Sequence, residues 1–463
     1  MASEHAFDVV VVGAGMPGVV AAVAAARNDV SVLLTDRFPF LGGNATAGLL
    51  GNFLTFHNMR GEQICAGIPQ EIVDECIRLG GCFPDHRGHL PNPYGNAFSV
   101  TPADAEVLKL VAQKLCVASG VHLMLDTYTI GPVLEGAQVV GIRVVNKSGE
   151  QIVRAMIVVD ASGDADLVAQ AGGPFLLGDD AGRTMSISLF FRLGGVNLER
   201  HLQYVKERPD QFLLGEDPFV GKSRAEVAAG LTHWKDYPLV TGYFEAVEAA
   251  KARGEFHKNR ERVVFSVTTI PGVVTVNSTS MLGYNPTDAS ALTQAALEGR
   301  EQVQAVTHFF RRYVPGFEDA FVLDSAAALG VRESRRIVGE EVLTTEACLA
   351  GTKTERDIGR GAYALDVHEP SGKIVHKHVA HGESYGIPYG CLVPKKVEQI
   401  LVAGRSLSSE RYANGSVRVQ AHVMAVGQAA GTAAALCVAK RWSPRDISVK
   451  ELRERLRGQG AVV

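Results

Sequence analysis

The chain opens with apolar runs separated by a glycine turn, a pattern typical of a parallel sheet. Residues 8–12 (DVVVV) form a continuous apolar run that ends at Gly13, and an alanine- and valine-rich stretch follows over 19–27. A second apolar run covers 30–34. Uninterrupted apolar strands are buried on both faces, as in sheets covered by helices on both sides. The opening therefore predicts a strand, a helix and a second, parallel strand.

Beyond this opening, the apolar pattern predicts further helices and strands. Apolar residues at helical spacing predict helices over 101–118, with Thr101 as the N-terminal cap, and over 287–313. Residues 270–272 (IPG) separate two short apolar runs and predict a turn between antiparallel strands. The other predicted strands cover 120–125, 139–146, 151–159, 183–196, 262–269, 273–280 and 400–403.

A glycine motif lies where the first strand turns into the first helix. Gly13, Gly15 and Gly18 form a G-x-G-x-x-G pattern, and Asp36 follows the second strand. The first glycine permits a tight turn, the second lets a pyrophosphate approach the backbone, and the third allows close helix packing. A carboxylate at Asp36 would accept hydrogen bonds from ribose hydroxyls. The alternative is a purely structural turn. The order and spacing of the strand, the glycines, the helix, the second strand and the acidic residue favour a dinucleotide site.

Two later segments indicate which dinucleotide is bound. Residues 41–48 (LGGNATAG) place a Gly-Gly loop soon after the ribose acid. This loop resembles the second pyrophosphate contact of FAD enzymes in the fumarate reductase and glutathione reductase superfamily. Residues 160–163 (DASG) end an apolar strand and resemble the A-T-G-type motif of FAD-binding folds. The alternative for the first segment is a loop with permissive glycines.

The carboxyl-terminal third carries the closest resemblance. Its segments are 330–340 (GVRESRRIVGE), 381–389 (HGESYGIPY), 400–405 (ILVAGR), 415–419 (GSVRV) and 427–433 (GQAAGTA). Together with the amino-terminal motifs, they resemble the FAD-dependent oxidoreductase family over essentially the whole chain. The resemblance implies that Gly404 lies beside the ribityl and pyrophosphate groups. Many relatives have an acidic residue after that glycine, whereas this chain has Arg405.

The stretch from Gly427 to Gly431 is interpreted as the start of a small-residue helix. Free N–H groups there would face the flavin edge that becomes negative on reduction, and Arg418 would add positive charge. The alternative is a tightly packed buried helix. The predicted FAD contacts are Gly13, Gly15, Met16, Pro17, Gly18, Asp36, Arg37, Gly42, Gly43, Asn44, Thr46, Thr129, Ala161, Ser162, Gly163, Gly404, Arg405, Arg418, Ala429 and Ala430.

These features predict an α/β fold in which a Rossmann-like FAD-binding domain contains a parallel central sheet. Its two parts cover 1–175 and 326–463. An inserted α+β substrate or cap domain with an antiparallel sheet covers 176–325, where no nucleotide motif is found.

Composition limits the partners that are expected. The 46 basic and 50 acidic residues give a net charge of −4, which is too balanced for binding to nucleic acid or an anionic membrane. The sequence shows no signal segment and no apolar run of membrane length, so we expect a cytoplasmic protein, and assembly into a homo-oligomer is left open. Seven scattered cysteines without a C-x-x-C pair disfavour a redox disulfide, an iron–sulfur cluster or a zinc site. Asp160, Asp164 and Asp166 suggest helix capping more than a metal site.

The candidate catalytic residues follow from the chemistry of a flavin beneath a cap. Arg332 has the planar donor fork to orient a carboxylate or stabilise an enolate, and His381 and Tyr385 are predicted to relay a proton. Arg332 has a structural alternative, pairing with the glutamates nearby in the sequence. Weaker candidates are Arg335, Tyr389, His57 and His422.

The favoured function is hydride transfer between flavin N5 and a small polar or cyclic organic substrate, as in a dehydrogenase or ene-reductase. The electron donor or acceptor is left open. One alternative is a monooxygenase that uses NAD(P)H and oxygen. Others are a hydratase or isomerase that needs FAD without net redox change, and an electron-carrier subunit, for which cysteine clusters or a large exposed apolar face would be expected.

Overall fold

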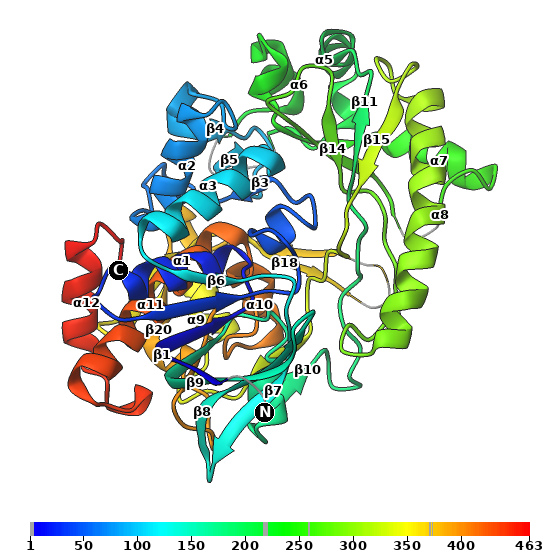
Figure 1. The fold of residues 1–463 in the computed structure, drawn as a ribbon. Coiled ribbons are helices and arrows are strands. Elements are labelled where there is room, and N and C mark those ends of the chain that lie inside the picture. Colours follow the sequence, from blue (N-terminus) through cyan, green and yellow to red (C-terminus); the bar gives the residue numbers. More distant parts are fainter. Residues whose placement is uncertain (1–3, 216–220, 258–259, 370–371, 373) are drawn as a thin grey trace.

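The structure is a computed structural model that describes residues 4–215, 221–257, 260–369, 372 and 374–463. Figure 1 shows a sheet-and-helix body that contains both chain termini, with a second layered region beside it, formed by the middle of the chain. Buried apolar residues form a large cluster in each region, one around helices α1 and α11 and one around the middle strands.

The body is built on a seven-stranded sheet with the order β6-β2-β1-β9-β8-β7, in which β21 also pairs with β9. Strands β6, β2, β1, β9 and β21 run parallel, whereas β8 and β7 are antiparallel additions. The first half of β9 pairs with β8, and its last residues pair with β21. The strands are β1 (Glu4–Val12), β2 (Val32–Thr35), β6 (His122–Met124), β7 (Tyr128–Glu135), β8 (Gln138–Asn146), β9 (Gly149–Asp160) and β21 (Ile400–Val402).

Helices α1 (Met16–Ala26) and α11 (Gln420–Lys440) pack closely against each other and against the sheet. Their glycines and alanines explain the closeness, because small side chains let two helix backbones approach. The other helices of the body are α2 (Ile68–Arg78), α3 (Ala105–Ala118), α4 (Asp166–Gln170), α9 (Thr345–Ala350), α10 (Arg411–Val417) and α12 (Val449–Gly458).

The middle of the chain forms a five-stranded antiparallel sheet with the order β12-β13-β14-β11-β15. These strands are β11 (Phe191–Gly194), β12 (Leu239–Gly242), β13 (Val263–Val267), β14 (Val274–Val276) and β15 (Phe321–Ser325). The accompanying helices are α5 (Leu198–Glu207), α6 (Arg224–Gly230), α7 (Phe244–Ala252) and the long α8 (Ala289–Tyr313). We call this region the cap; the domain boundaries at 175/176 and 325/326 stay predictions.

Four small sheets complete the described part of the fold. One consists of β3 (Asn52–Leu54), β5 (Ser99–Pro102) and β4 (Leu90–Pro91). The others are the pairs β10 (Phe175–Leu177) with β16 (Arg335–Ile337), β17 (Asp357–Gly361) with β20 (Tyr385–Pro388), and β18 (Leu365–His368) with β19 (Ile374–Lys377).

The α/β fold class and the antiparallel pairing of β13 with β14 are confirmed, but some element boundaries differ. Asp104, not Thr101, caps α3, because its carboxylate accepts hydrogen bonds from the N–H groups of Glu106 and Val107. The strand predicted over 183–196 is regular only at β11. Helix α11 begins at Gln420, several residues before the predicted start.

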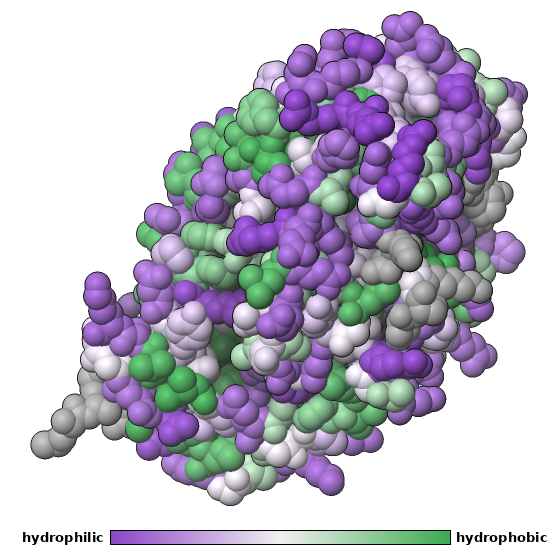
Figure 2. All heavy atoms as spheres, turned by 90° about the vertical axis from the view of Figure 1, so that its right-hand side faces the viewer, coloured by the Kyte–Doolittle hydropathy of each residue, from purple (hydrophilic) through white to green (hydrophobic). Residues whose placement is uncertain are grey.

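Two observations concern the surface. Among the described residues, one helix, α11, is long and apolar enough to cross a membrane, but 94% of its apolar window is buried inside the fold. On the face shown in Figure 2, hydrophilic side chains predominate and hydrophobic ones lie in scattered patches. The cytoplasmic location and the possible homo-oligomer stay predictions.

Candidate functional site

A cavity of about 740 Å³ lies where the carboxyl ends of the parallel strands meet the cap. This is within the range of roughly 300–1,000 Å³ that is usual for ligand pockets. Its lining comes from segments spread over the whole chain. The predicted site residues that line it are Gly13, Gly15, Met16, Pro17, Asp36, Arg37, Gly42, Gly43, Asn44, Thr129, Ala161, Ser162, Gly163, Arg332, Gly404, Arg405 and Arg418.

The three glycines of the β1–α1 turn differ in the atoms that a side chain at each position would meet. A Cβ on Gly13 would lie 2.5 Å from the carbonyl oxygen of Ala161, and one on Gly18 would lie 1.9 Å from the carbonyl oxygen of Gly13. Gly15 has an ordinary φ of −60°, and a Cβ there would meet only Pro17 Cδ, at 3.7 Å. The protein itself therefore requires Gly13 and Gly18, whereas Gly15 is open to the cavity and suits the close approach of a ligand.

The Gly-Gly loop lies directly against this turn. Gly42 donates its N–H to the carbonyl of Ala14 at 2.8 Å, and a Cβ on Gly43 would lie 2.7 Å from Gly15 Cα. Thr46 does not line the cavity, because its hydroxyl is buried behind the loop and donates to the carbonyl of Leu41 at 2.7 Å. Thr46 supports the loop; the structure does not place it as a direct contact.

Asp36 lies at the end of β2, where its carboxylate accepts hydrogen bonds from the N–H groups of Ala14, at 2.5 Å, and Phe38, at 2.9 Å. Burial raises the pKa of Asp36, and these backbone donors oppose the rise. The side chain also lines the cavity, so it fixes the glycine turn from the side on which the ribose is predicted.

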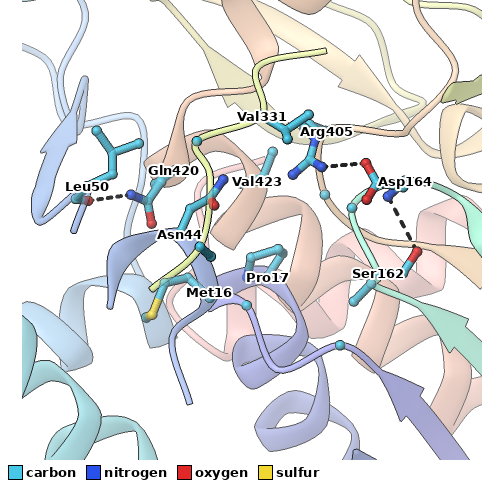
Figure 3. A pocket seen from close by; sticks show the side chains of 18 of the residues that line it. Met16, Pro17, Asn44, Leu50, Ser162, Asp164, Val331, Arg405, Gln420 and Val423 are labelled. Carbon is cyan, nitrogen blue, oxygen red and sulfur yellow. Dashed lines mark hydrogen bonds and ion pairs between the residues drawn. The ribbon is translucent and has the colours of Figure 1, made fainter. Parts of the chain in front are cut away.

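The three aspartates after β9 each have a separate partner. Asp160 accepts from the N–H of Leu167 at 3.0 Å and caps α4, while Asp166 pairs with Arg335 at 2.8 Å. Asp164 pairs with Arg405 at 2.6 Å at the wall of the cavity (Figure 3). Within the described ranges, no group of three or more metal-ligating residues occurs.

Arg405 is paired with a carboxylate at the cavity wall. Asp164 comes from the loop after β9, pairs with Arg405 at 2.6 Å and lines the cavity. Arg405 lies against Gly163, where a Cβ would be 2.7 Å from the guanidinium. An acidic side chain therefore still lines this part of the cavity.

Helix α11 points its N-terminus into the same cavity. Its first residue, Gln420, lines the cavity and donates its amide to the carbonyl of Leu50 at 2.7 Å (Figure 3). No side chain caps the helix, so its first N–H groups are available for a ligand. Helix α1 is likewise uncapped by a side chain, and the two open helix ends suit the phosphates and the electron-accepting ring of a flavin nucleotide.

The stretch from Gly427 to Gly431 has a different role from the predicted one. A Cβ on Gly427 would lie 2.3 Å from the carbonyl oxygen of Pro17, and one on Gly431 would lie 2.0 Å from that of Ala21. Ala429 and Ala430 are fully buried inside α11 and do not line the cavity. The alternative of close helix packing therefore explains this stretch, and the helix end that lines the cavity lies at Gln420.

The cavity continues beyond the glycine loops to an end that we call the far end. It is lined by Asn277, Arg332, Tyr363, Asp366 and His368, which come from the cap, from the loop before β16 and from the β18 region. Arg332 donates to the carbonyl of Ser186 and to the hydroxyl of Ser188, both at 2.8 Å. Apart from Arg332, these residues were not predicted, because each stands alone in the sequence without a motif.

The other predicted catalytic residues lie outside the cavity lining. His381 is exposed in a left-handed turn with a φ of 54°. Tyr385 is fully buried, its hydroxyl shares a hydrogen bond of 2.6 Å with that of Ser416, and burial raises its pKa well above the usual value. Their positions do not support a proton relay in this cavity.

The weaker candidates also have structural partners. Tyr389 is buried and donates its hydroxyl to the carbonyl of Pro444 at 2.8 Å. The two ring nitrogens of His422 lie 3.3 Å from the N–H of Ala362 and 3.3 Å from the carbonyl of Ser416.

Comparisons with known proteins agree with this geometry. The family model described as FAD dependent oxidoreductase matches residues 8–456. No curated protein matches the sequence. A geranylgeranyl bacteriochlorophyll reductase-like structure from Thermoplasma acidophilum is 13% identical, covers 99% of this chain and 85% of its own, and has a TM-score of 0.48.

Two further structures are similar at the same level. A myxobacterial chondrochloren halogenase is 13% identical with a TM-score of 0.47, covering 97% of this chain and 78% of its own. The p-nitrophenol 4-monooxygenase of Pseudomonas putida is 12% identical with a TM-score of 0.45. It covers 97% of this chain and 83% of its own. Similarity at this level does not bear on the substrate. The family match over nearly the whole chain identifies the protein as a member of the FAD-dependent oxidoreductase family, an enzyme whose cofactor is FAD.

Proposed function

We propose that the protein transfers a hydride between FAD and a small polar or cyclic organic substrate, as a dehydrogenase or an ene-reductase does. The observation that carries the proposal is the continuity of the cavity. One cavity is lined by the glycine loops, by Gln420 at the N-terminus of α11 and by the far-end residues, among them Asn277 of the cap. Bound FAD supplies the hydride acceptor or donor, and the chain supplies orientation and proton transfer.

The far end offers groups suited to orienting a substrate. Arg332 presents a guanidinium whose bonds to Ser186 and Ser188 fix its position, so it can orient a substrate. Asp366 is suited to accept a hydrogen bond from a substrate hydroxyl or amine. Burial raises its pKa, but contacts with His368 and His376 outweigh burial and hold that pKa well below the usual value, so the carboxylate is ionised.

The test is to purify the protein with its flavin and to record the visible flavin bands under anaerobic conditions. Small alcohols, amines, acids and unsaturated acids are added singly to the oxidised protein. Unsaturated acids are also added to the reduced protein. We expect at least one compound to bleach the oxidised flavin, or to reoxidise the reduced flavin, without NAD(P)H.

Two outcomes contradict the proposal. If NAD(P)H bleaches the flavin rapidly only when an organic compound is present, the protein is a hydroxylase. If a compound is turned over while the flavin stays unchanged, the protein is a hydratase or isomerase.

A further inference from the structure

Three arginines meet at the far end of the cavity from separate parts of the chain. They are Arg260, which precedes β13, Arg332 and Arg418, the residue that follows α10. Nitrogens of Arg332 and Arg260 lie 3.2 and 3.5 Å from the same oxygen, Asn277 Oδ1. Arg332 and Arg418 line the cavity, and Arg260 is 5% exposed behind them.

The hydrogen bonds of Arg332 and Arg260 orient these side chains but do not neutralise their charge. Arg260 donates to the carbonyl oxygen of Thr279 at 3.0 Å, and the acceptors of Arg332 are likewise neutral oxygens. Within the part of the chain that the structure describes, neither guanidinium has a carboxylate within 4.0 Å. Burial, and then the nearby guanidiniums of Arg260 and Arg418, lower the pKa of Arg332 to about 9.

Among the described residues, one carboxylate, that of Asp366, faces the three arginines, and it is shared with a histidine. Its Oδ2 lies 3.4 Å from Arg418 Nη2, and its Oδ1 lies 2.8 Å from His376 Nε2. Nε of Arg418 is buried without a hydrogen-bond partner among the described residues, as is Nε of Arg260. Three positive groups thus have one negative partner in a place sheltered from water, where uncompensated charge is costly.

Two other arginines with little exposure are paired with carboxylates. Arg336, which is 3% exposed, lies 2.6 Å from a carboxylate oxygen of Glu333. Arg411 lies 2.8 Å from Glu369 and 3.3 Å from Glu333. Arg453, which is 8% exposed, donates to the carbonyls of Thr354 and Asp357 and stands alone. The far end differs because three arginines meet there around one shared carboxylate.

We propose that the substrate is an organic acid and that its carboxylate binds Arg332 and Arg418 at the far end. This proposal rests on the proposed function, because it names the substrate class of that same cavity. A guanidinium can donate two parallel hydrogen bonds to a carboxylate, and the positive group behind it strengthens the attraction. The phosphates of FAD are a different source of negative charge, and their expected place is at the glycine turn.

The test uses the FAD-loaded protein and two pairs of probes, benzoate with benzamide and succinate with succinamide. Binding is followed by the change in the visible flavin spectrum. We expect the acids to bind and their amides to bind at least about tenfold more weakly. Arg332→Gln should weaken acid binding by roughly 10- to 100-fold, because it removes a charged hydrogen-bond donor.

Two further variants make the test specific. Asp366→Asn should tighten acid binding, because it removes the one competing negative charge. Arg356→Gln is the matched control: Arg356 lies outside the cavity lining and has its own partner, Glu341, which is also outside it, so acid binding should not change. If Arg332→Gln does not fold, Arg418→Gln replaces it with the same expectation.

The proposal is overturned if acids and amides bind equally. It is also overturned if Arg332→Gln shifts the reduction potential of the ligand-free flavin while acid binding stays unchanged, because the cluster would then serve the cofactor. The two proposals fail separately. If acids bind but no hydride is transferred, only the proposed function is contradicted. If a neutral alcohol bleaches the flavin and acids do not bind to the protein, only the present proposal is contradicted.

Discussion

At the scale of single residues, Gly15 is a glycine that we expect ligand binding to require and the fold not to require. Because a Cβ there meets only Pro17, the variant Gly15→Ala should keep the unfolding temperature of the FAD-free protein. It should weaken FAD binding by about tenfold or more, since the methyl group occupies the approach to the backbone. Both quantities can be measured, by thermal unfolding of apoprotein and by titration with FAD.

The matched control is Gly18→Ala in the same motif. Its Cβ would lie 1.9 Å from the carbonyl oxygen of Gly13, so we expect a loss of at least roughly 1–3 kcal/mol in unfolding free energy before FAD is added. If Gly15→Ala destabilises the apoprotein as much as Gly18→Ala does, the assignment of Gly15 to the ligand is wrong.

At the scale of elements, the contact between α1 and α11 holds the two open helix ends at one cavity. A Cβ on Gly431 would lie 2.0 Å from the carbonyl oxygen of Ala21, whereas one on Gly458, in α12, would have no atom within 4 Å. Alanine is the better helix former by about 1 kcal/mol, so Gly458→Ala should be neutral or stabilising. Gly431→Ala should lower the free energy of unfolding by roughly 1–3 kcal/mol, as urea denaturation would measure. Equal effects of the two changes would contradict this role of the contact.

This contact also shows where sequence reasoning succeeds and where it fails. The β1–α1 turn could be predicted, because its strand, glycines and helix follow one another directly in the chain. The glycines of α11 could be identified as part of a small-residue helix, but they were expected to face the flavin. They pack against α1 instead, which lies some four hundred residues earlier in the chain. The far end could not be assembled from the sequence, because Asn277, Tyr363 and Asp366 meet only through tertiary packing of the cap against the body.

At the scale of the whole molecule, buried histidines link stability to pH. Burial lowers the pKa of His89 and of His201 to about 3, and that of His257 and of His422 to about 4. In the unfolded chain these groups have their ordinary pKa of about 6.5, so between pH 6.5 and 4 the unfolded state binds protons that the folded state does not. Their contribution to stability is therefore complete above pH 6.5 and is lost as the pH falls below it.

Asp160 acts in the opposite direction, because burial raises its pKa to about 6 and the folded state takes up a proton there first. The four histidines, together with His368, whose pKa burial also lowers to about 3, outweigh this one group. The free energy of unfolding should therefore fall by several kcal/mol between pH 7 and pH 5, at roughly 1.4 kcal/mol per histidine and pH unit. Urea unfolding at pH 7, 6 and 5 measures the slope. The variant His257→Gln should make the slope shallower, because it removes one of these histidines. A stability that is constant or rises as the pH falls over this range would mean that these histidines are not buried in their neutral form.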